Sequence, residues 1–137
     1  MEVLQLPVQL HGIRLGRPVD LLLDQVAWRV LGFVVLCGDE SERFLAYAAA
    51  DPEEDEIAVP SALLLLEDVD FYRTRARSLR ALLDSPVTSG EVEVGALHDL
   101  LLAGDGLVAS LVVERNEALY EVEPAGARIA APSLATG

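Results

Sequence analysis

The most constraining feature of this sequence is an apolar run, Val30–Cys37, that is interrupted by a single glycine, Gly32. Large apolar residues occupy both sets of alternating positions, as in a strand whose two faces are both covered. A glycine inside such a strand is typical of a bulge or a sharp bend. The polar residues 38–42 that follow predict a turn. The run therefore predicts a long buried strand that bends at Gly32.

A second stretch, Val92–Leu97, has the same pattern and carries Gly95. A constant offset of 63 residues places Gly32 on Gly95 without a gap and aligns the turns and apolar stretches that follow. The agreement lies in the pattern of apolar residues, because few residues are identical. The similar pattern of the two stretches predicts two similar modules. Their predicted ranges are 1–77 and 78–137.

Short apolar stretches at regular spacing, joined by turns that carry glycine and aspartate, favour an all-β fold. The expected architecture is two tandem small β-barrels with short helical turns, since no helical periodicity extends beyond about two turns. Strands are expected at 3–8, 30–37, 44–49, 57–59 and 69–75, a turn at 15–19, and helical turns at 60–64 and 78–83. The four consecutive leucines 63–66 also leave a strand open for the segment that begins at 60. The segment 132–137 is expected to fray.

The charge of the chain is strongly acidic, with 23 Asp and Glu residues, 10 basic residues that are all arginine, and a net charge of −13. Nucleic acids and anionic membranes are therefore disfavoured as partners, because both require positive charge. No apolar run is long enough for a membrane span, and the first residues lack the pattern of a signal peptide. A cytoplasmic protein is expected, and Cys37, as the only cysteine, excludes an intrachain disulfide.

The apolar content, 52% of the residues, is high for modules of this size. Modules of about 60 residues have little interior, so some apolar surface is expected to be covered by contacts between modules or between subunits. This composition predicts a homodimer.

Each predicted module carries a set of short motifs. In the first copy they are Leu15-Gly16-Arg17-Pro18-Val19, Leu31-Gly32-Phe33-Val34-Val35 and Ile57-Ala58-Val59-Pro60-Ser61-Ala62. In the second copy they are Pro86-Val87, Val94-Gly95-Ala96-Leu97-His98-Asp99, Gly106-Leu107-Val108 and Leu111-Val112-Val113. These motifs resemble the PRC-barrel domain, a module shared by the photosynthetic reaction centre H subunit and the C-terminal part of a ribosome maturation factor. Asp99 falls where the family often carries an aspartate after the glycine strand.

The resemblance covers residues 13–132 and implies small open β-barrels that bind other proteins and carry no catalytic residues. Neither a transmembrane helix nor an RNA-maturation domain is expected before the first copy. We therefore expect this chain to share the module type of the two proteins, but not the specific role of either one.

Arginines gather near the end of the first module, where Arg73, Arg75 and Arg77 would share one face if the strand expected over 69–75 continues to 77. The planar guanidinium group suits carboxylates. With Arg80, these residues are expected to bind an acidic partner, for which the acidic loop Asp51–Glu56 of the same or a neighbouring chain is one candidate. The alternative is a solvated linker that binds nothing.

No catalytic, cofactor or metal site is expected elsewhere. His98 and Asp99 are neighbours on a strand and point to opposite faces, so with Asp105 they form no metal site. The serines lack a nucleophile elbow, and Cys37 has no local base. The favoured function is a non-enzymatic adaptor with an unidentified protein partner. The alternative is a small-molecule-binding or sensing barrel with a pocket between the modules.

Overall fold

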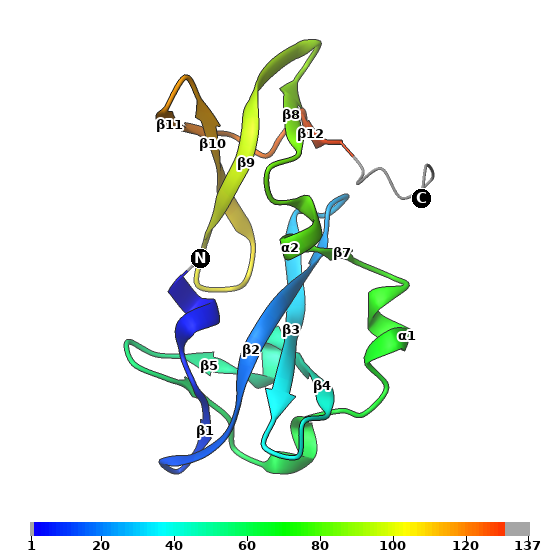
Figure 1. Cartoon of the computed structure of the whole chain (residues 1–137), viewed down its shortest axis with the longest axis vertical. Helices are drawn as coiled ribbons and strands as arrows, with labels where there is room; N and C mark the ends of the chain where they lie inside the picture. The colour runs from blue at the N-terminus through cyan, green and yellow to red at the C-terminus, as the bar shows by residue number, and fades with distance from the viewer. Residues whose placement is uncertain (1, 131–137) are drawn as a thin grey trace. The chain divides into compact units, whose positions relative to one another are not determined.

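The structure, a computed structural model, describes residues 2–130 of the 137-residue chain (Figure 1). Contacts between residues divide the chain into two units, one that ends at Ser78 and one that begins at Leu79. Each unit contains one β-sheet and only short helical segments. The predicted all-β class is confirmed for the described residues, and the predicted fraying of 132–137 lies outside them.

The first unit is built on a seven-stranded sheet in which β2 and β3 form a long hairpin (Figure 1). The order is β4-β3-β2-β1-β6-β5, and β7 pairs with β2. Its strands are β1 (Val8–Leu10), β2 (Ile13–Asp24), β3 (Arg29–Cys37), β4 (Glu42–Ala46), β5 (Asp51–Pro52), β6 (Ile57–Ala58) and β7 (Arg77–Ser78). Its helical segments are η1 (Glu2–Gln5), η2 (Tyr47–Ala49), η3 (Ala62–Leu64) and α1 (Val69–Arg73).

The predicted strand Val30–Cys37 is confirmed as β3, and the irregularity expected at Gly32 is present. Gly32 lies opposite Leu22, whereas the next residue of β2, Leu23, lies opposite Val30, so the ladder shifts beside the glycine. A Cβ atom at Gly32 would overlap the carbonyl oxygen of Leu45. The neighbouring strand approaches so closely there that only glycine fits.

The turn predicted at 15–19 is wrong, because β2 continues through it. Pro18 lies opposite Val35, and the register then shifts so that the next pair joins Asp20 to Val34. This bulge accommodates a proline, which lacks an N–H group, inside a central strand. The strand predicted at 3–8 is also largely wrong, since η1 occupies its beginning and β1 starts only at Val8.

The strand predicted at 69–75 is wrong as well, because this segment forms the helix α1. Asp68 caps the helix by accepting a hydrogen bond from the backbone N–H of Phe71 at 3.2 Å. Val69 and Tyr72, three residues apart, share one face of a helix. Val69 packs in the same cluster as Phe44, and the Tyr72 ring stacks on the Phe44 ring. Capping and packing thus override the strand-like local pattern.

The other local predictions agree better with the structure. The strand expected at 44–49 is confirmed as β4, although its end becomes η2, and the strand expected at 57–59 is present as β6. The helical turn predicted at 60–64 is η3, which Ser61 caps by accepting from the N–H of Leu63 at 3.1 Å. The helical turn predicted at 78–83 is α2 (Leu79–Leu82).

The second unit contains α2 and a five-stranded sheet with the order β11-β10-β9-β8-β12. Its strands are β8 (Pro86–Ser89), β9 (Val92–Leu102), β10 (Val108–Arg115), β11 (Ala118–Val122) and β12 (Ala127–Ile129). Buried apolar side chains of these elements form its core. They are Leu79, Leu82, Val87, Leu97, Leu100, Val108, Leu111, Val113, Ala127 and Ile129.

The strand orders of the two sheets show that the predicted repeat offset of 63 residues is wrong. Gly95 lies in β9, the partner of β8 and β10, and the corresponding strand of the first unit is β2 rather than β3. The equivalent of Gly95 is therefore Gly16, at an offset of 79 residues, and the predicted equivalence of Gly32 and Gly95 is wrong. The same offset aligns Pro7-Val8 with Pro86-Val87 and Asp20-Leu21-Leu22-Leu23 with Asp99-Leu100-Leu101-Leu102.

Atomic contacts support this new alignment. A Cβ atom at Gly16 would lie 2.5 Å from the carbonyl oxygen of Leu36, and one at Gly95 would lie 2.6 Å from that of Glu114. Asp20 and Asp99 also behave alike, because Oδ1 of each accepts a hydrogen bond from the next backbone N–H, at 2.8 and 2.7 Å. Glycine and aspartate thus recur at the same two positions of the two sheets.

Among the described residues, no helix is both long enough and apolar enough to cross a lipid bilayer.

Candidate partner-binding site

Arg73, the first of the four predicted site residues, is the last residue of α1 and has carboxylate partners within the first unit. Its Nη2 atom lies 2.8 Å from Oε1 of Glu42 in β4, and its Nη1 atom lies 3.8 Å from Oδ1 of Asp70. Because these side chains are substantially exposed, the pairs stabilise the fold by at most about 1 kcal/mol. Arg73 thus links α1 to β4.

Arg75 lies in the turn after α1 and has no carboxylate partner in the described part of the chain. Its guanidinium carbon lies 3.7 Å from the centroid of the Phe71 ring. Its Nη1 atom donates to the carbonyl oxygen of Phe71 at 2.8 Å and to Oγ1 of Thr74 at 3.2 Å. The ring and the turn hold the guanidinium group in place without neutralising its charge.

Arg77 lies in β7, opposite Leu23 of β2. Its Nη1 atom donates to Oε1 of Gln25. Its Nη2 atom is buried and has no hydrogen-bond acceptor among the described residues. A buried donor without an acceptor costs about 1–3 kcal/mol, so an acceptor that reached Nη2 would recover part of this cost.

Arg75 and Arg77 line a cavity of about 300 Å³ between residues 23–26 and residues 74–77, which we call the arginine pocket. Asp24 lines the same cavity, but its Oδ1 atom accepts the backbone N–H groups of Val26 and Ala27 at 3.0 and 3.1 Å. That carboxylate therefore stabilises the turn after β2. The pocket is thus lined by two arginines, of which the exposed Arg75 has no carboxylate partner among the described residues.

The predicted common face of Arg73, Arg75 and Arg77 on one strand is wrong. Arg73 ends a helix, Arg75 lies in a turn and Arg77 lies in a strand. Only Arg75 and Arg77 line the pocket. Arg80 lies in α2 of the second unit and is exposed. Sequence spacing located the cluster but did not show which members already have partners.

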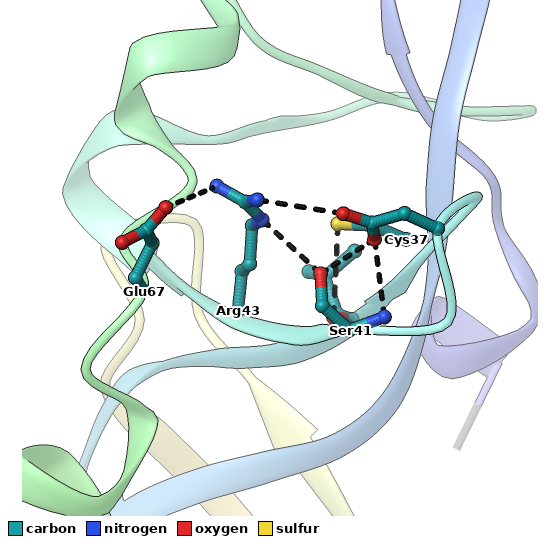
Figure 2. Close-up of polar contacts among 6 residues, drawn as sticks. Cys37, Ser41, Arg43 and Glu67 are labelled. Carbon is teal, nitrogen blue, oxygen red and sulfur yellow. Dashed lines mark hydrogen bonds and ion pairs between the residues drawn. The ribbon is translucent and has the colours of Figure 1, made fainter.

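A group of polar contacts around Arg43 was not predicted from the sequence (Figure 2). The Arg43 side chain in β4 lies between Ser41 and Glu67: Nε donates to Oγ of Ser41 at 3.3 Å, and Nη1 lies 3.5 Å from Oε1 of Glu67. Nη2 lies 3.6 Å from Oδ2 of Asp39. The alternation of Asp39, Ser41 and Arg43 was the available signal. These contacts fasten the β3–β4 turn to the segment before α1.

The same turn sets the ionisation of two groups. The Ser41 hydroxyl and backbone N–H both donate to Asp39 and hold the pKa of that carboxyl group below its usual value. Burial raises the pKa of the Cys37 thiol, and the nearby Arg43 only partly opposes this effect. A raised pKa keeps the thiol protonated at neutral pH, and a protonated thiol is a poor nucleophile.

The acidic loop Asp51–Glu56 borders a larger cavity of about 620 Å³ in the first unit. Alanines from η2 and β6 line it together with His11 and three carboxylate residues, Asp51, Glu53 and Glu56. Partial desolvation and the charges of neighbouring acidic residues raise the pKa of Glu53. Within the described chain, Arg73, Arg75 and Arg77 form no ion pair with this loop.

The residues considered for a metal site do not converge. His98 Nδ1 lies 3.9 Å from Oε2 of Glu114, whereas Asp99 and Asp105 accept the backbone N–H groups of Leu100 and Leu107. Among residues 2–130, no group of three His, Cys, Asp or Glu side chains is arranged to hold a metal ion.

Comparison with known proteins gives no family assignment: no protein-family model matches the chain, and no curated protein matches it.

Proposed function

We propose that this chain is a non-enzymatic adaptor of PRC-barrel type that binds an acidic segment of a partner protein through the arginine pocket. The proposed modules are the two tandem barrels, residues 1–77 and 78–137. The corrected repeat supports this proposal, because both copies read Gly-x-x-x-Asp-Leu-Leu-Leu, at 16–23 and at 95–102. Asp20 thereby occupies the place in the first copy that Asp99 occupies in the second.

The observation that carries the proposal is that two arginines without a carboxylate partner among the described residues line one cavity. Among the described residues, Arg75 has no carboxylate partner and the buried Nη2 atom of Arg77 has no acceptor, and both residues line the cavity. Hydrogen bonds between a guanidinium group and a carboxylate are stronger than neutral ones and are often bidentate. An acidic side chain entering the pocket would pair with Arg75 and be attracted by the positive charge of Arg77.

Of the other predicted site residues, Arg73 supports the pocket by fixing α1, and Arg80, which lies in the second module, stays a proposed partner-binding residue. The net charge of −13 disfavours nucleic acid as the partner. The protonated Cys37 thiol and the dispersed His98, Asp99 and Asp105 support a function without catalysis. A cytoplasmic location fits the single unpaired cysteine.

Nuclear magnetic resonance tests this proposal directly. Acetylated hexaglutamate amide is titrated into the ¹⁵N-labelled chain, and the Nε–Hε signals of Arg75 and Arg77 are followed with the backbone amides of 23–26 and 74–77. We expect these signals to shift together and saturably. Shifts that are absent at millimolar peptide, or that spread evenly over all arginines, would refute the proposal.

A small-molecule-binding function is the second candidate, and one observation favours it. The cavity beside the acidic loop measures about 620 Å³ and combines apolar alanines with a few polar groups, as ligand sites of roughly 300–1,000 Å³ do. A thermal-shift screen of small organic cations tests this candidate. Saturable stabilisation that Glu53→Gln together with Glu56→Gln abolishes would support it.

A further inference from the structure

The equivalent edge strands of the two sheets differ in how far the rest of the chain covers them. In the first unit the edge strand β4 is covered by its own chain, because Phe44 and Leu66 exchange two backbone hydrogen bonds, each 2.8 Å long. The helix that follows adds a second cover, since the Tyr72 ring stacks on the Phe44 ring at 3.8 Å between centroids. The first unit thus hides both the backbone and the side chains of this edge.

In the second unit the corresponding edge strand is β11, at one end of the sheet (Figure 1). The pair Phe33–Leu45 in the first hairpin corresponds to the pair Leu111–Val122 in the second, so Glu121 takes the place of Phe44. The chain then passes directly to β12 through a short turn. No other strand of the described chain pairs with the outer side of β11.

The turn between β10 and β11 shows which backbone groups face outward. Asn116 and Glu117 have φ angles of 54° and 65°, as in a two-residue type I′ hairpin turn. The flanking pair, Arg115 and Ala118, is then hydrogen-bonded, and hydrogen-bonded pairs alternate along an antiparallel ladder. The N–H and C=O groups of Leu119 and Glu121 therefore point away from β10.

Two features that often protect an edge strand, a β-bulge and a proline or lysine residue, are missing from β11. Its ladder with β10 has no register shift, and the strand contains neither proline nor lysine. Leu119 and Tyr120 are 54% and 53% exposed. The carboxylates near this edge, Glu117, Glu121 and Glu123, give it a negative charge. An extended segment with apolar and positively charged side chains matches these properties.

We infer that β11 is a binding edge for an extended, basic segment of a partner protein, which adds to the sheet as a further strand. Strand addition supplies affinity through main-chain hydrogen bonds and specificity through alternate side chains. A second copy of this chain fits less well. Antiparallel pairing of two β11 strands about Tyr120 would place Glu117 opposite Glu123 of the other copy, and facing like charges destabilise a sheet.

The test uses the full chain and an acetylated heptapeptide amide in which arginine alternates with valine. We expect saturable binding that slows hydrogen exchange of the Leu119 and Glu121 amides and not of the Tyr120 amide, which is already bonded to β10. A matched peptide with N-methyl groups at alternate residues keeps the charge but cannot pair. It is expected to bind at least about tenfold more weakly, the equivalent of about 1.4 kcal/mol.

Variants of β11 distinguish the contribution of backbone strand pairing to binding from the contribution of charge. Glu121→Pro removes an outward N–H group and leaves the ladder with β10 intact, so it is expected to abolish the exchange protection. Glu121→Ala removes only the charge and is expected to weaken binding about threefold, whereas Glu91→Ala, in the β8–β9 turn, leaves it unchanged. Equal binding of the methylated peptide, or an equal effect of Glu91→Ala and Glu121→Ala, would overturn the inference. Exchange protection without peptide, together with a dimeric mass, would show that a second copy is the occupant and would also overturn it.

Discussion

The rings of Phe44 and Tyr72 lie nearly parallel, with 8° between their planes and 3.8 Å between their centroids. Phe44 is buried in β4, and Tyr72 projects from α1, so the stack joins the edge strand of the first sheet to the helix. The arginine pocket follows directly after this helix in the chain. The stack therefore sets the position of the turn that carries Arg75.

Removing the stack should destabilise the first unit. Tyr72→Ala is expected to lower the free energy of unfolding by about 2 kcal/mol, because it removes a half-buried ring and its stacking energy. Tyr72→Phe keeps the ring and should change the free energy by less than about 0.5 kcal/mol. Urea denaturation measures both values. Equal effects of the two substitutions would contradict the role assigned to the stack.

The close approaches at Gly16 and Gly95 lead to a second prediction. Gly16→Ala and Gly95→Ala each place a Cβ atom against a backbone carbonyl oxygen, and should each destabilise the chain by about 2 kcal/mol. Gly95 also has a φ angle of 148°, which disfavours other residues. Gly38→Ala is the control, because nothing lies within 4 Å of its added Cβ. Urea denaturation showing Gly38→Ala as costly as the others would be incompatible with this account.

The two equivalent aspartates, Asp20 and Asp99, should contribute unequally to the free energy of unfolding. Asp20 is buried and accepts hydrogen bonds from the Leu21 N–H and the Ser78 hydroxyl, whereas Asp99 is only half-buried. Asp20→Ala is therefore expected to cost about 2 kcal/mol and Asp99→Ala about 1 kcal/mol. Differential scanning calorimetry compares the two variants. A larger loss for Asp99→Ala would mean that burial does not govern the contribution of this motif.

The Asp39 carboxyl group predicts a pH dependence. Its pKa is lowered in the folded chain, mainly by the hydrogen bond from the Ser41 hydroxyl. The group therefore stabilises the fold above the pKa that it has in the unfolded chain, and this contribution is lost as the pH falls through the lower folded value. Carboxyl ¹³C titration should show the lowered pKa, and Ser41→Ala should raise it. An unchanged pKa in this variant would exclude the hydroxyl as the cause.

Sequence reasoning predicted the β class and the buried strand Val30–Cys37 because the pattern of apolar residues along a strand can be recognised within a few neighbouring positions. It placed the repeat at the wrong offset because both Gly16 and Gly32 lie in apolar surroundings. Only strand pairing shows that Gly16 faces the carbonyl of Leu36 as Gly95 faces that of Glu114. The more local signal, the shared Asp-Leu-Leu-Leu at Asp20 and Asp99, was available in the sequence.

The candidate site was predictable in part. The arginine cluster was visible as composition, but the helix α1 was not, because Phe71-Tyr72 resembles strand sequence and the Asp68 cap is a weak signal. Which guanidinium groups have partners depends on contacts across the fold, such as those of Arg73 with Glu42 and Arg77 with Gln25. The residues of each pair lie far apart in the sequence, so neither pair can be recognised from the spacing of residues.

Light scattering addresses the homodimer expected from composition. Exposed apolar side chains such as Leu63, at 87%, and Val26, at 96%, are compatible with a further covered surface. A dimeric mass that is unchanged by Arg75→Ala with Arg77→Ala would place self-association outside the arginine pocket.

The central claim is that Arg75 and Arg77 bind an acidic segment, and isothermal titration of hexaglutamate amide tests it most directly. The double variant Arg75→Ala/Arg77→Ala is compared with Arg14→Ala/Arg17→Ala, which removes the same charge elsewhere in the first unit. The account predicts that the pocket variant binds at least about tenfold more weakly than the wild type and that the control loses less than about threefold. Equal losses in the two variants, or no loss in the pocket variant, would contradict it.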